Sequence, residues 1–397
     1  MRGRLLRRIC DLTRLPRKIL LVPLPRRLST VTADIAVDQP QSSSVFTPHT
    51  DTTKFTLADE ALWYRIPLDS FKEKFGLTSL PYEYRKQMDT FGELAFMIRR
   101  PFLDLISCFN AVHPDLPVNR FVLFGKSGTG KSSTIIQMAQ LAHSKGWIVC
   151  HVPDPFKWSR KYREISMSTW KPGRIDLPLE SADWLKSFRV LNADLIEQHE
   201  LKTSKEYKWT SREVTEEKQS LLNVVDMGIN RVKFASDCIG VLLRELKLHA
   251  SAKRVPVLLS IDVANSMFYQ TSIKREDRSF APADNLTLNM IFRDMMLSTW
   301  NNGMVVLVAD GAIKGRYNFP SHFPYHIFGP EGFEHLDPFI PIPIETYSEL
   351  EAMSLLDYYD SKHWIHNEQL KTEEGRKEFI RLAAFNPKAL ERLCAAF

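Results

Sequence analysis

A glycine-rich motif in the first half of the 397-residue chain has the residue types and spacing that bind phosphate. Gly125, Gly130, Lys131 and Ser132 match the pattern G-x-x-x-x-G-K-S/T. Glycines allow successive backbone amides to point at phosphate oxygens, and a helix that follows adds the positive end of its dipole. We expect Lys131 to reach the β- and γ-phosphates and Ser132 to bind Mg²⁺. The predicted nucleotide-binding residues are Gly125, Lys126, Ser127, Gly128, Thr129, Gly130, Lys131, Ser132 and Ser133.

A carboxylate at the end of a second apolar segment is the expected partner of this loop. Residues 255–261 are mostly apolar and are followed by Asp262. In many P-loop proteins an acid at the tip of a neighbouring strand holds Mg²⁺ through a water molecule. The sequence therefore predicts a Mg²⁺ site formed by Ser132 and Asp262. The alternative interpretation of Asp262 is an ordinary strand-end aspartate without a ligand.

The neighbours of Asp262 argue against efficient hydrolysis. Val263 and Ala264 follow it, where ATPases of the AAA-like kind commonly carry a glutamate that activates water. No catalytic residue is assigned, and we expect the site to bind nucleotide better than it cleaves it. The guanine-reading motif N-K-x-D is absent from the sequence, so these residues leave GTP, GDP and ATP open as ligands. Two arginines, candidates for an arginine finger or ordinary surface residues, are Arg275 and Arg293.

The elements around the loop have the order strand, glycine loop, helix that such a motif requires. Hydrophobic patterning predicts a strand over residues 119–124 before the loop and a helix over residues 133–143 after it. Strands that alternate with helices predict an α/β fold with a parallel-sheet core. Four further strands, the last an edge strand because of its prolines, are predicted over residues 147–152, 255–261, 304–309 and 339–344.

The rest of the chain is divided around this core. Residues 55–118 are predicted to be an N-terminal extension packed on it, residues 119–345 the nucleotide-binding domain, and residues 346–397 a C-terminal helical lid. We expect an inserted helical region over about residues 156–217, because a simple nucleotide-binding domain does not need this stretch. Its tryptophans, interpreted as packing residues or as a contact surface, are Trp158, Trp170, Trp184 and Trp209.

Two helix predictions concern the later parts of the chain. Regularly spaced apolar residues predict one long helix over residues 221–250. Asn386 and Pro387 predict the N-cap and the first position of a last helix, because an asparagine side chain accepts from helix amides and proline tolerates the first turn.

Basic residues concentrate at the N-terminus. The first 28 residues contain nine Arg or Lys and one Asp, which more than accounts for the net charge of +6 and leaves the rest of the chain slightly acidic. An Arg-rich, acid-poor start is typical of a mitochondrial transit peptide, predicted over residues 1–30. Residues 31–54, rich in Ser, Thr, Pro and Gln, are expected to be a disordered linker. A basic RNA-binding arm is the alternative.

The part of the chain after the first 28 residues has no excess of positive charge, which argues against a free RNA-binding protein. No apolar run of about 18 residues occurs, so no membrane span is expected. The five cysteines are scattered and form no C-x-x-C pair, which argues against a disulfide scaffold or a zinc ribbon. One local cluster, suited to phosphate contact or to a solvated face, comprises Lys157, Arg160, Lys161, Arg163, Lys171 and Arg174, interleaved with Trp158, Tyr162 and Trp170.

Taken in order, the motifs of the chain resemble those of the mitoribosomal death-associated protein family over about residues 55–397. A P-loop alone is shared by many unrelated proteins, whereas the series is specific. The segments that carry the resemblance are 123–132 (LFGKSGTGKS), 151–154 (HVPD), 179–186 (LESADWLK), 207–209 (YKW), 228–232 (GINRV), 273–277 (IKRED), 332–333 (GF), 337–342 (DPFIPI) and 386–387 (NP).

The resemblance implies a fold, a set of ligands and a place of action. The fold would be a P-loop NTPase domain of AAA or STAND type with a helical insertion and a helical lid, binding GTP or GDP, with ATP as a further option, and Mg²⁺. The protein would be a structural component of the small-subunit head of the mitochondrial ribosome, in the matrix. Its partners would be small-subunit rRNA, ribosomal proteins and nearby large-subunit proteins. The family name adds a link to programmed cell death, and an active NTPase that acts as a switch or remodelling factor is the alternative.

Overall fold

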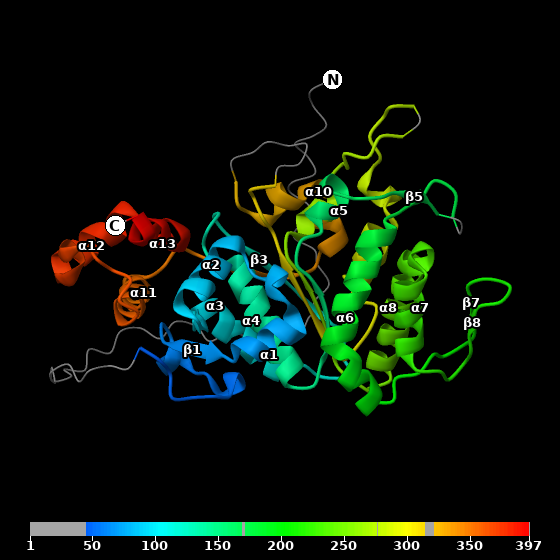
Figure 1. The fold of residues 1–397 in the computed structure, drawn as a ribbon, viewed down its shortest axis with the longest axis horizontal. Helices are drawn as coiled ribbons and strands as arrows, with labels where there is room; N and C mark the ends of the chain where they lie inside the picture. Colours follow the sequence, from blue (N-terminus) through cyan, green and yellow to red (C-terminus); the bar gives the residue numbers. More distant parts are fainter. Residues whose placement is uncertain (1–44, 169–170, 276, 314–320, 397) are drawn as a thin grey trace, which may run out of the picture. The chain divides into compact units, whose positions relative to one another are not determined.

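A five-stranded parallel sheet is the centre of the fold (Figure 1). The computed structural model describes residues 45–168, 171–275, 277–313 and 321–396. The strands lie in the order β11, β3, β10, β9, β4, and Val306 of β10 is paired with Phe121 of β3 and with Ser260 of β9. Their bounds are β3 (Asn119–Phe124), β4 (Ile148–Val152), β9 (Val257–Ile261), β10 (Gly303–Val308) and β11 (Ile340–Pro343).

The sheet confirms the predicted α/β fold with a parallel-sheet core. All five predicted strands form, and β11 lies at an edge of the sheet. Pro341 and Pro343, which have no amide hydrogen to donate, are tolerated there because an edge strand has a neighbour on one side only. Because the strands are parallel, their carboxyl ends lie at the same edge of the sheet. The loops after β3, β9 and β10 therefore meet there.

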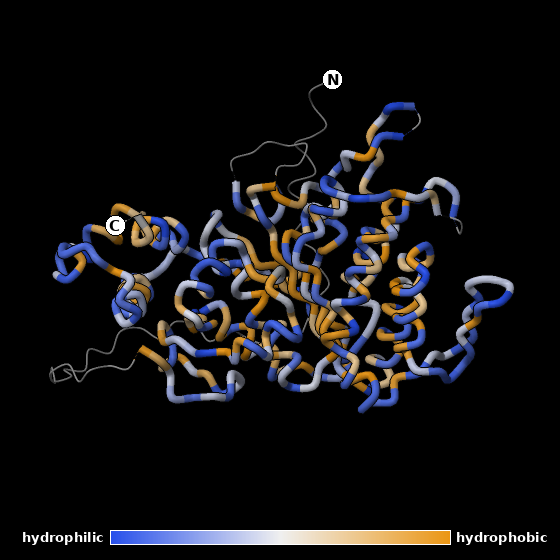
Figure 2. Tube along the Cα trace, viewed as in Figure 1, coloured by the Kyte–Doolittle hydropathy of each residue, from blue (hydrophilic) through white to orange (hydrophobic). Residues whose placement is uncertain are grey.

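Helices cover both faces of the sheet, because successive side chains of a strand point to opposite sides. Leu259 belongs to one hydrophobic cluster and Leu258 to the other, and both are fully buried. Figure 2 shows hydrophobic residues concentrated along the central strands. The helices that contribute to the first cluster include α6 (Pro178–Gln198), α7 (Leu221–Asn230), α8 (Ala235–Ser251) and α9 (Thr287–Met295). Those that contribute to the second include α1 (Leu68–Phe75), α3 (Arg100–Asn110) and α4 (Lys131–Ser144).

The segment before β3 carries a two-stranded antiparallel sheet of β1 (Trp63–Ile66) and β2 (Leu94–Met97), with α2 (Tyr82–Phe91) between them. The structure corrects the linker prediction for residues 45–54. The amide of Thr47 donates to the carbonyl of Trp63 at 2.9 Å, so this stretch is tied to β1 rather than free. The predicted transit peptide, residues 1–30, and linker residues 31–44 lie outside the described residues.

Within the predicted helical insertion, residues 156–217, the main helix is α6. The other parts are the short helix α5 (Phe156–Arg160) and two small antiparallel pairs, β5 (Ser166–Met167) with β6 (Ile175–Asp176) and β7 (Tyr207–Lys208) with β8 (Val214–Thr215). Trp158 and Trp184 are each 6% exposed, which supports their interpretation as packing residues. Such short pairs leave almost no periodic signal in a sequence.

The single helix predicted over residues 221–250 is wrong. The structure has α7 and α8 joined by the 3₁₀ turn η4 (Val232–Phe234), and Arg231 leaves the helical conformation with φ −118° and ψ 73°. The two helices pack against each other and against α6. Their apolar residues can all reach the same cluster only if the chain folds back at this turn.

The C-terminal segment is helical, as predicted. The side-chain oxygen of Asn386 accepts from the amides of Lys388 at 3.1 Å and Ala389 at 3.2 Å, which confirms the predicted N-cap. These helices pack on β1, where the ring of Trp63 stacks on that of Tyr358 with centroids 4.0 Å apart. The elements are α11 (Glu349–Ser361), η7 (Glu368–Lys371), α12 (Glu373–Leu382) and α13 (Pro387–Ala396).

The remaining elements are short turns and one kinked helix. Over the described ranges of the chain, no helix is both long enough and apolar enough to cross a membrane. These elements are η1 (Thr52–Lys54), η2 (Leu57–Asp59), η3 (Leu77–Ser79), η5 (Ala264–Phe268), η6 (Ala283–Asn285) and α10 (Pro324–Leu336).

A side chain from α6 closes the outer edge of β4. The buried Asn192 accepts from the amide of Val149 at 2.8 Å and donates to its carbonyl at 3.0 Å. Asn192 also donates to the carbonyl of Phe188 at 3.0 Å. It therefore takes the place of a neighbouring strand at this edge.

We expect Asn192→Ala to lower the free energy of unfolding by about 3 kcal/mol, because it leaves buried amide and carbonyl groups of β4 without partners. Urea denaturation of the purified variant measures this loss. Asn223→Ala, at an exposed position on α7, serves as the matched control and should change stability by less than about 0.5 kcal/mol. Equal stability of the two variants would contradict the edge-closing role.

Candidate phosphate-binding site

The loop between β3 and α4 has a backbone that only glycine adopts easily. Gly125, Gly128 and Gly130 have φ angles of +151°, +80° and +97°. A Cβ atom at Gly125 would lie 2.2 Å from the carbonyl oxygen of Ile344, a distance that no side chain tolerates. Both the left-handed conformation and the close approach therefore require glycine at this end of the loop.

Helix α4 begins directly after the loop and directs its amino end at it. Its N-cap is Gly130, which has no side chain to satisfy the first amides, so these donors remain available for an anion. Lys131 is 6% exposed, and its Nζ donates to the carbonyl oxygens of Gly125 at 3.1 Å and Lys126 at 2.8 Å. Burial lowers the pKa of Lys131, and the carboxylates of Asp310 and Asp262 oppose that shift.

Asp262 lies next to Ser132, as the predicted Mg²⁺ site requires. Asp262 is 9% exposed, and burial raises its pKa to about 6. A hydrogen bond with Ser132 and another from the amide of Val263, at 2.8 Å, favour the ionised form, whereas nearby Asp310 disfavours it. A buried carboxylate beside a hydroxyl and a second carboxylate is a set of oxygen donors that suits Mg²⁺.

Asp310 is a residue of this site that the sequence reasoning missed. It follows β10, which lies between β3 and β9 in the sheet, and its charge acts on both Lys131 and Asp262. The side chain of Asn265 in η5 holds it in place, accepting from its amide at 3.0 Å and donating to its carbonyl at 3.1 Å. An acid directly after an apolar strand was the signal that selected Asp262, and it applies equally to Asp310.

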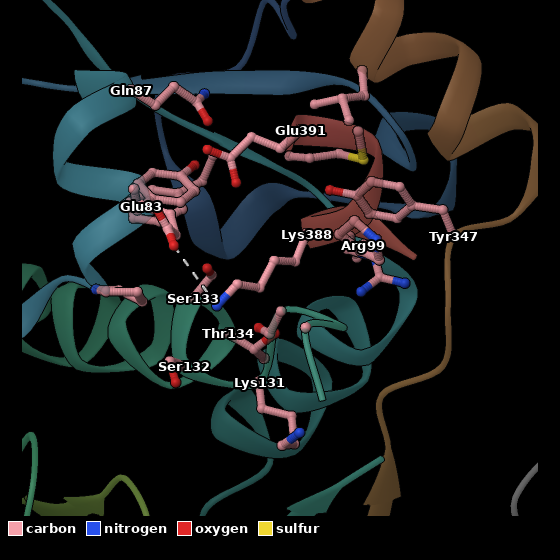
Figure 3. A pocket seen from close by; sticks show the side chains of 18 of the residues that line it. Glu83, Gln87, Arg99, Lys131, Ser132, Ser133, Thr134, Tyr347, Lys388 and Glu391 are labelled. Atoms are coloured by element: carbon pink, nitrogen blue, oxygen red, sulfur yellow. Dashed lines mark hydrogen bonds and ion pairs between the residues drawn. The ribbon is translucent and has the colours of Figure 1, made fainter. Parts of the chain in front are cut away.

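A cavity of about 240 Å³ lies over the start of α4 (Figure 3). Its walls come from the loop, from α2 and β2, and from α11 and α13. Six of the nine predicted loop residues line it: Ser127, Gly128, Gly130, Lys131, Ser132 and Ser133. The other three, Gly125, Lys126 and Thr129, line a separate hollow beside Ile344.

Arg99 joins the loop to the C-terminal helices and was not identified from the sequence. Its guanidinium donates to the carbonyl of Thr129 at 2.7 Å and to a carboxylate oxygen of Glu351 at 2.8 Å. It also donates to the carbonyl of Glu345 at 3.0 Å and lies over the ring of Tyr347. A charge at this position therefore fixes three segments of the chain at once.

Asn386 forms a second connection between the loop and the C-terminal helices. Besides capping α13, it donates through its side-chain amide to the carbonyl of Ser127 at 2.9 Å. The amide of Lys388 donates to the carbonyl of Gly128 at 3.2 Å, and a Cβ atom at Gly128 would come within 2.8 Å of Asn386 and Lys388. The sequence predicted the cap but not this contact.

Other candidates from the sequence lie away from the cavity. Neither Arg275 nor Arg293 lines it, and Arg293 packs over the ring of Phe268. Among the residues that the structure describes, no group of three or more His, Cys, Asp or Glu is placed to hold a metal ion. In the basic cluster, Arg163 is paired with Glu180 and Asp183. Trp158 of the same cluster is buried, and Trp170 lies outside the described residues.

The fold and the site define an α/β protein whose parallel sheet carries a glycine loop, a helix amino terminus and a buried carboxylate at one edge. The model of one protein family, described as mitochondrial ribosomal death-associated protein 3, matches residues 96–393. The chain is 34% identical over 368 residues to the small ribosomal subunit protein mS29 of Mus musculus, covering 93% of both chains. It is 35% identical over 332 residues to the protein of that name from Bos taurus, covering 84% of this chain and 83% of the relative. The chain therefore belongs to the mitochondrial ribosomal death-associated protein 3 family.

In protein without nucleotide or Mg²⁺, we expect Asp262→Asn to raise the free energy of unfolding by about 2 kcal/mol near pH 7. Burial raises the pKa of Asp262 from the 3.8 of a solvent-exposed aspartate, as in the unfolded chain, to about 6 in the folded chain, which is therefore the stronger proton binder. Stability from this group is therefore full below the lower value and is lost as the pH rises through the higher one. The side-chain amide of the Asp262→Asn variant does not ionise, so the variant does not lose this stability as the pH rises.

Urea denaturation at several pH values between about 4 and 7 measures this effect. The gain of Asp262→Asn should disappear near the acid end of the range, where the wild-type carboxyl is protonated. Asp89→Asn, which changes an exposed carboxylate on α2, should show no such dependence. If Asp262→Asn is no more stable than wild type near neutral pH, the claim that burial disfavours the ionised form of Asp262 is wrong.

Proposed function

We propose that this chain binds GTP or GDP with Mg²⁺ and is a structural component of the small subunit of the mitochondrial ribosome. The observation that carries the nucleotide part is the glycine loop at the amino end of α4, with Lys131 at its centre and the pair Ser132 and Asp262 beside it. This is the arrangement expected of a P-loop domain, and the resemblance to the family adds the proposal of an AAA or STAND type.

The residues present fit a magnesium nucleotide. The free amides at the start of α4 and the Nζ of Lys131 would hold the phosphates, whose oxygens would replace the carbonyls that Lys131 now contacts. The hydroxyl of Ser132 and the carboxylate of Asp262 would hold Mg²⁺, which neutralises phosphate charge when bound. The positive ion would also relieve the repulsion between Asp262 and Asp310.

The ribosomal part of the proposal rests on the family and on the names of its relatives. Both relatives are named as proteins of the small ribosomal subunit, and they cover most of the chain. The partners proposed for this chain are small-subunit rRNA and ribosomal proteins, with large-subunit proteins nearby, in the mitochondrial matrix. A role in cell death rests on the family description alone.

Binding rather than turnover is the proposed use of the site. Asp262 is followed by Val263, whose φ of +53° turns the chain into η5, and then by the buried Ala264. Neither side chain can activate water. The nucleotide would instead contact the loop, α2 and the C-terminal helices at once, and so stabilise their arrangement.

Lys131→Ala should weaken the binding of GDP and Mg²⁺ by about 10- to 100-fold, since it removes a charged hydrogen-bond donor from the phosphates. At a thousand times the dissociation constant, GDP should stabilise the wild-type chain by about 4 kcal/mol, and the variant much less. Thermal denaturation with and without nucleotide measures both. Lys218→Ala, at a side chain that is 83% exposed, is the control, and a full GDP effect in Lys131→Ala would refute the proposed site.

The wild-type chain should sediment with small ribosomal subunits from purified mitochondria and carry guanine nucleotide, and Lys131→Ala should associate with them less. The variant should associate less with the subunits if the nucleotide stabilises the arrangement of the loop, α2 and the C-terminal helices. Sucrose-gradient sedimentation followed by nucleotide extraction tests both statements. Absence of the wild-type chain from the particles would refute the ribosomal proposal, whereas normal association of a nucleotide-free variant would refute the stabilising role.

A further inference from the structure

The cavity over α4 continues beyond the phosphate region into a space that suits a flat ring. Tyr84 and Phe96 from the N-terminal extension and Leu355 and Tyr359 from α11 line this part. Apolar and aromatic walls with few polar groups are typical of the part of a pocket that holds a base. The polar groups that do reach this space would therefore decide which base fits.

Glu391 on α13 is one of these groups. Figure 3 shows its side chain in the upper part of the cavity, with Ser133 between it and Lys131. Within the part of the chain that the structure describes, no hydrogen bond or ion pair engages its carboxylate. Glu83, the other acid of the cavity, is instead engaged by Arg392 at 3.3 Å and Lys388 at 3.9 Å.

The surroundings of Glu391 leave its charge poorly compensated. Burial raises its pKa, and the carboxylate of Glu83 raises it further, while the positive charges of Lys388, Arg392 and Lys86 oppose both effects. A partly buried carboxylate of this kind gains most from a ligand that offers hydrogen-bond donors. It gains nothing from a ligand that offers acceptors.

Guanine and adenine differ in the hydrogen-bond donors and acceptors that they could present to this carboxylate. An ionised carboxylate accepts hydrogen bonds at both oxygens and donates none. Guanine presents two adjacent donors, the N1 hydrogen and the N2 amino group, which match the two oxygens. Adenine presents an acceptor, N1, beside its N6 amino group, so that one carboxylate oxygen would face a lone pair.

We propose that Glu391 selects guanine in this pocket, its carboxylate accepting from N1 and from the N2 amino group. The inference rests on the proposed nucleotide site and names the residue that gives this site its specificity. It also assigns a role to α13, whose first turn already contacts the loop through Asn386 and Lys388. Guanine selection would therefore depend on the same helix that covers the phosphates.

The test compares GDP, ADP and xanthosine diphosphate, each with Mg²⁺, on the full chain and on Glu391→Gln. Wild type should prefer GDP to ADP by about 10- to 100-fold, the range of one good bidentate contact. Glu391→Gln should lose about tenfold in GDP affinity and gain about tenfold for xanthosine diphosphate, because xanthine carries an acceptor where guanine carries the amino group. Glu374→Gln, on an exposed part of α12, is the control and should match wild type.

The outcomes separate this inference from the proposed function. If wild type binds no nucleotide, both fail. If wild type binds GDP in a Lys131-dependent manner but Glu391→Gln keeps the wild-type preference, or if neither chain distinguishes GDP from ADP, only the role of Glu391 is overturned.

A second measurement needs no variant and so does not depend on how Glu391→Gln folds. Inosine diphosphate lacks the N2 amino group, and 1-methylguanosine diphosphate lacks the N1 hydrogen. Wild type should bind each of them about tenfold more weakly than GDP. Equal affinity for all three would overturn the inference.

Discussion

The arrangement of this protein depends on one buried ion pair, between Arg99 and Glu351. Their side chains are only 10% and 5% exposed, and a charge left unpaired at such a depth destabilises a fold by several kcal/mol. Arg99 also binds the carbonyl of Thr129. Because the carbonyl and the following amide of a peptide plane point in opposite directions, this bond directs the amide of Gly130 away from Arg99. The ion pair thus sets the loop and anchors α11 at the same time.

The site at the sheet edge contains an unfavourable interaction, the repulsion between the carboxylates of Asp262 and Asp310, that a bound cation would relieve. Lys131 and Asp262 are buried, Asp310 is partly exposed beside them, and two carboxylates act on a single ammonium group. Sites of this kind are commonly kept at the expense of stability, because their residues are chosen for binding rather than for folding. A bound Mg²⁺ would supply the positive charge that this cluster lacks, and the phosphates would pair with Lys131, so occupancy and stability should rise together.

The proposed binding of a nucleotide, at a site where Val263 and Ala264 follow Asp262 in place of a catalytic glutamate, fits a structural part in a large assembly. The cavity is built from three regions that are far apart in the chain: the loop, the N-terminal extension and the C-terminal helices. A nucleotide that contacts all three regions would hold them together for as long as it stays bound, whereas hydrolysis would remove some of these contacts. The proposed guanine contact of Glu391 would extend this bracing from the phosphates to the base.

The sequence by itself determined the features that depend on neighbours in the chain. The glycine loop, the apolar strands, the parallel α/β core and the cap at Asn386 follow from spacing within a few residues, since backbone conformation and helix capping are short-range effects. Asp262 was identified as the acid near the loop, and by the same signal Asp310 could have been. Only the tertiary structure decided the rest. The break at Arg231 and the small pairs of the insertion are set by packing, and the bond of Arg99 to Glu351 joins residues 252 positions apart. Contacts over such distances form only when the chain folds, because no local preference encodes them.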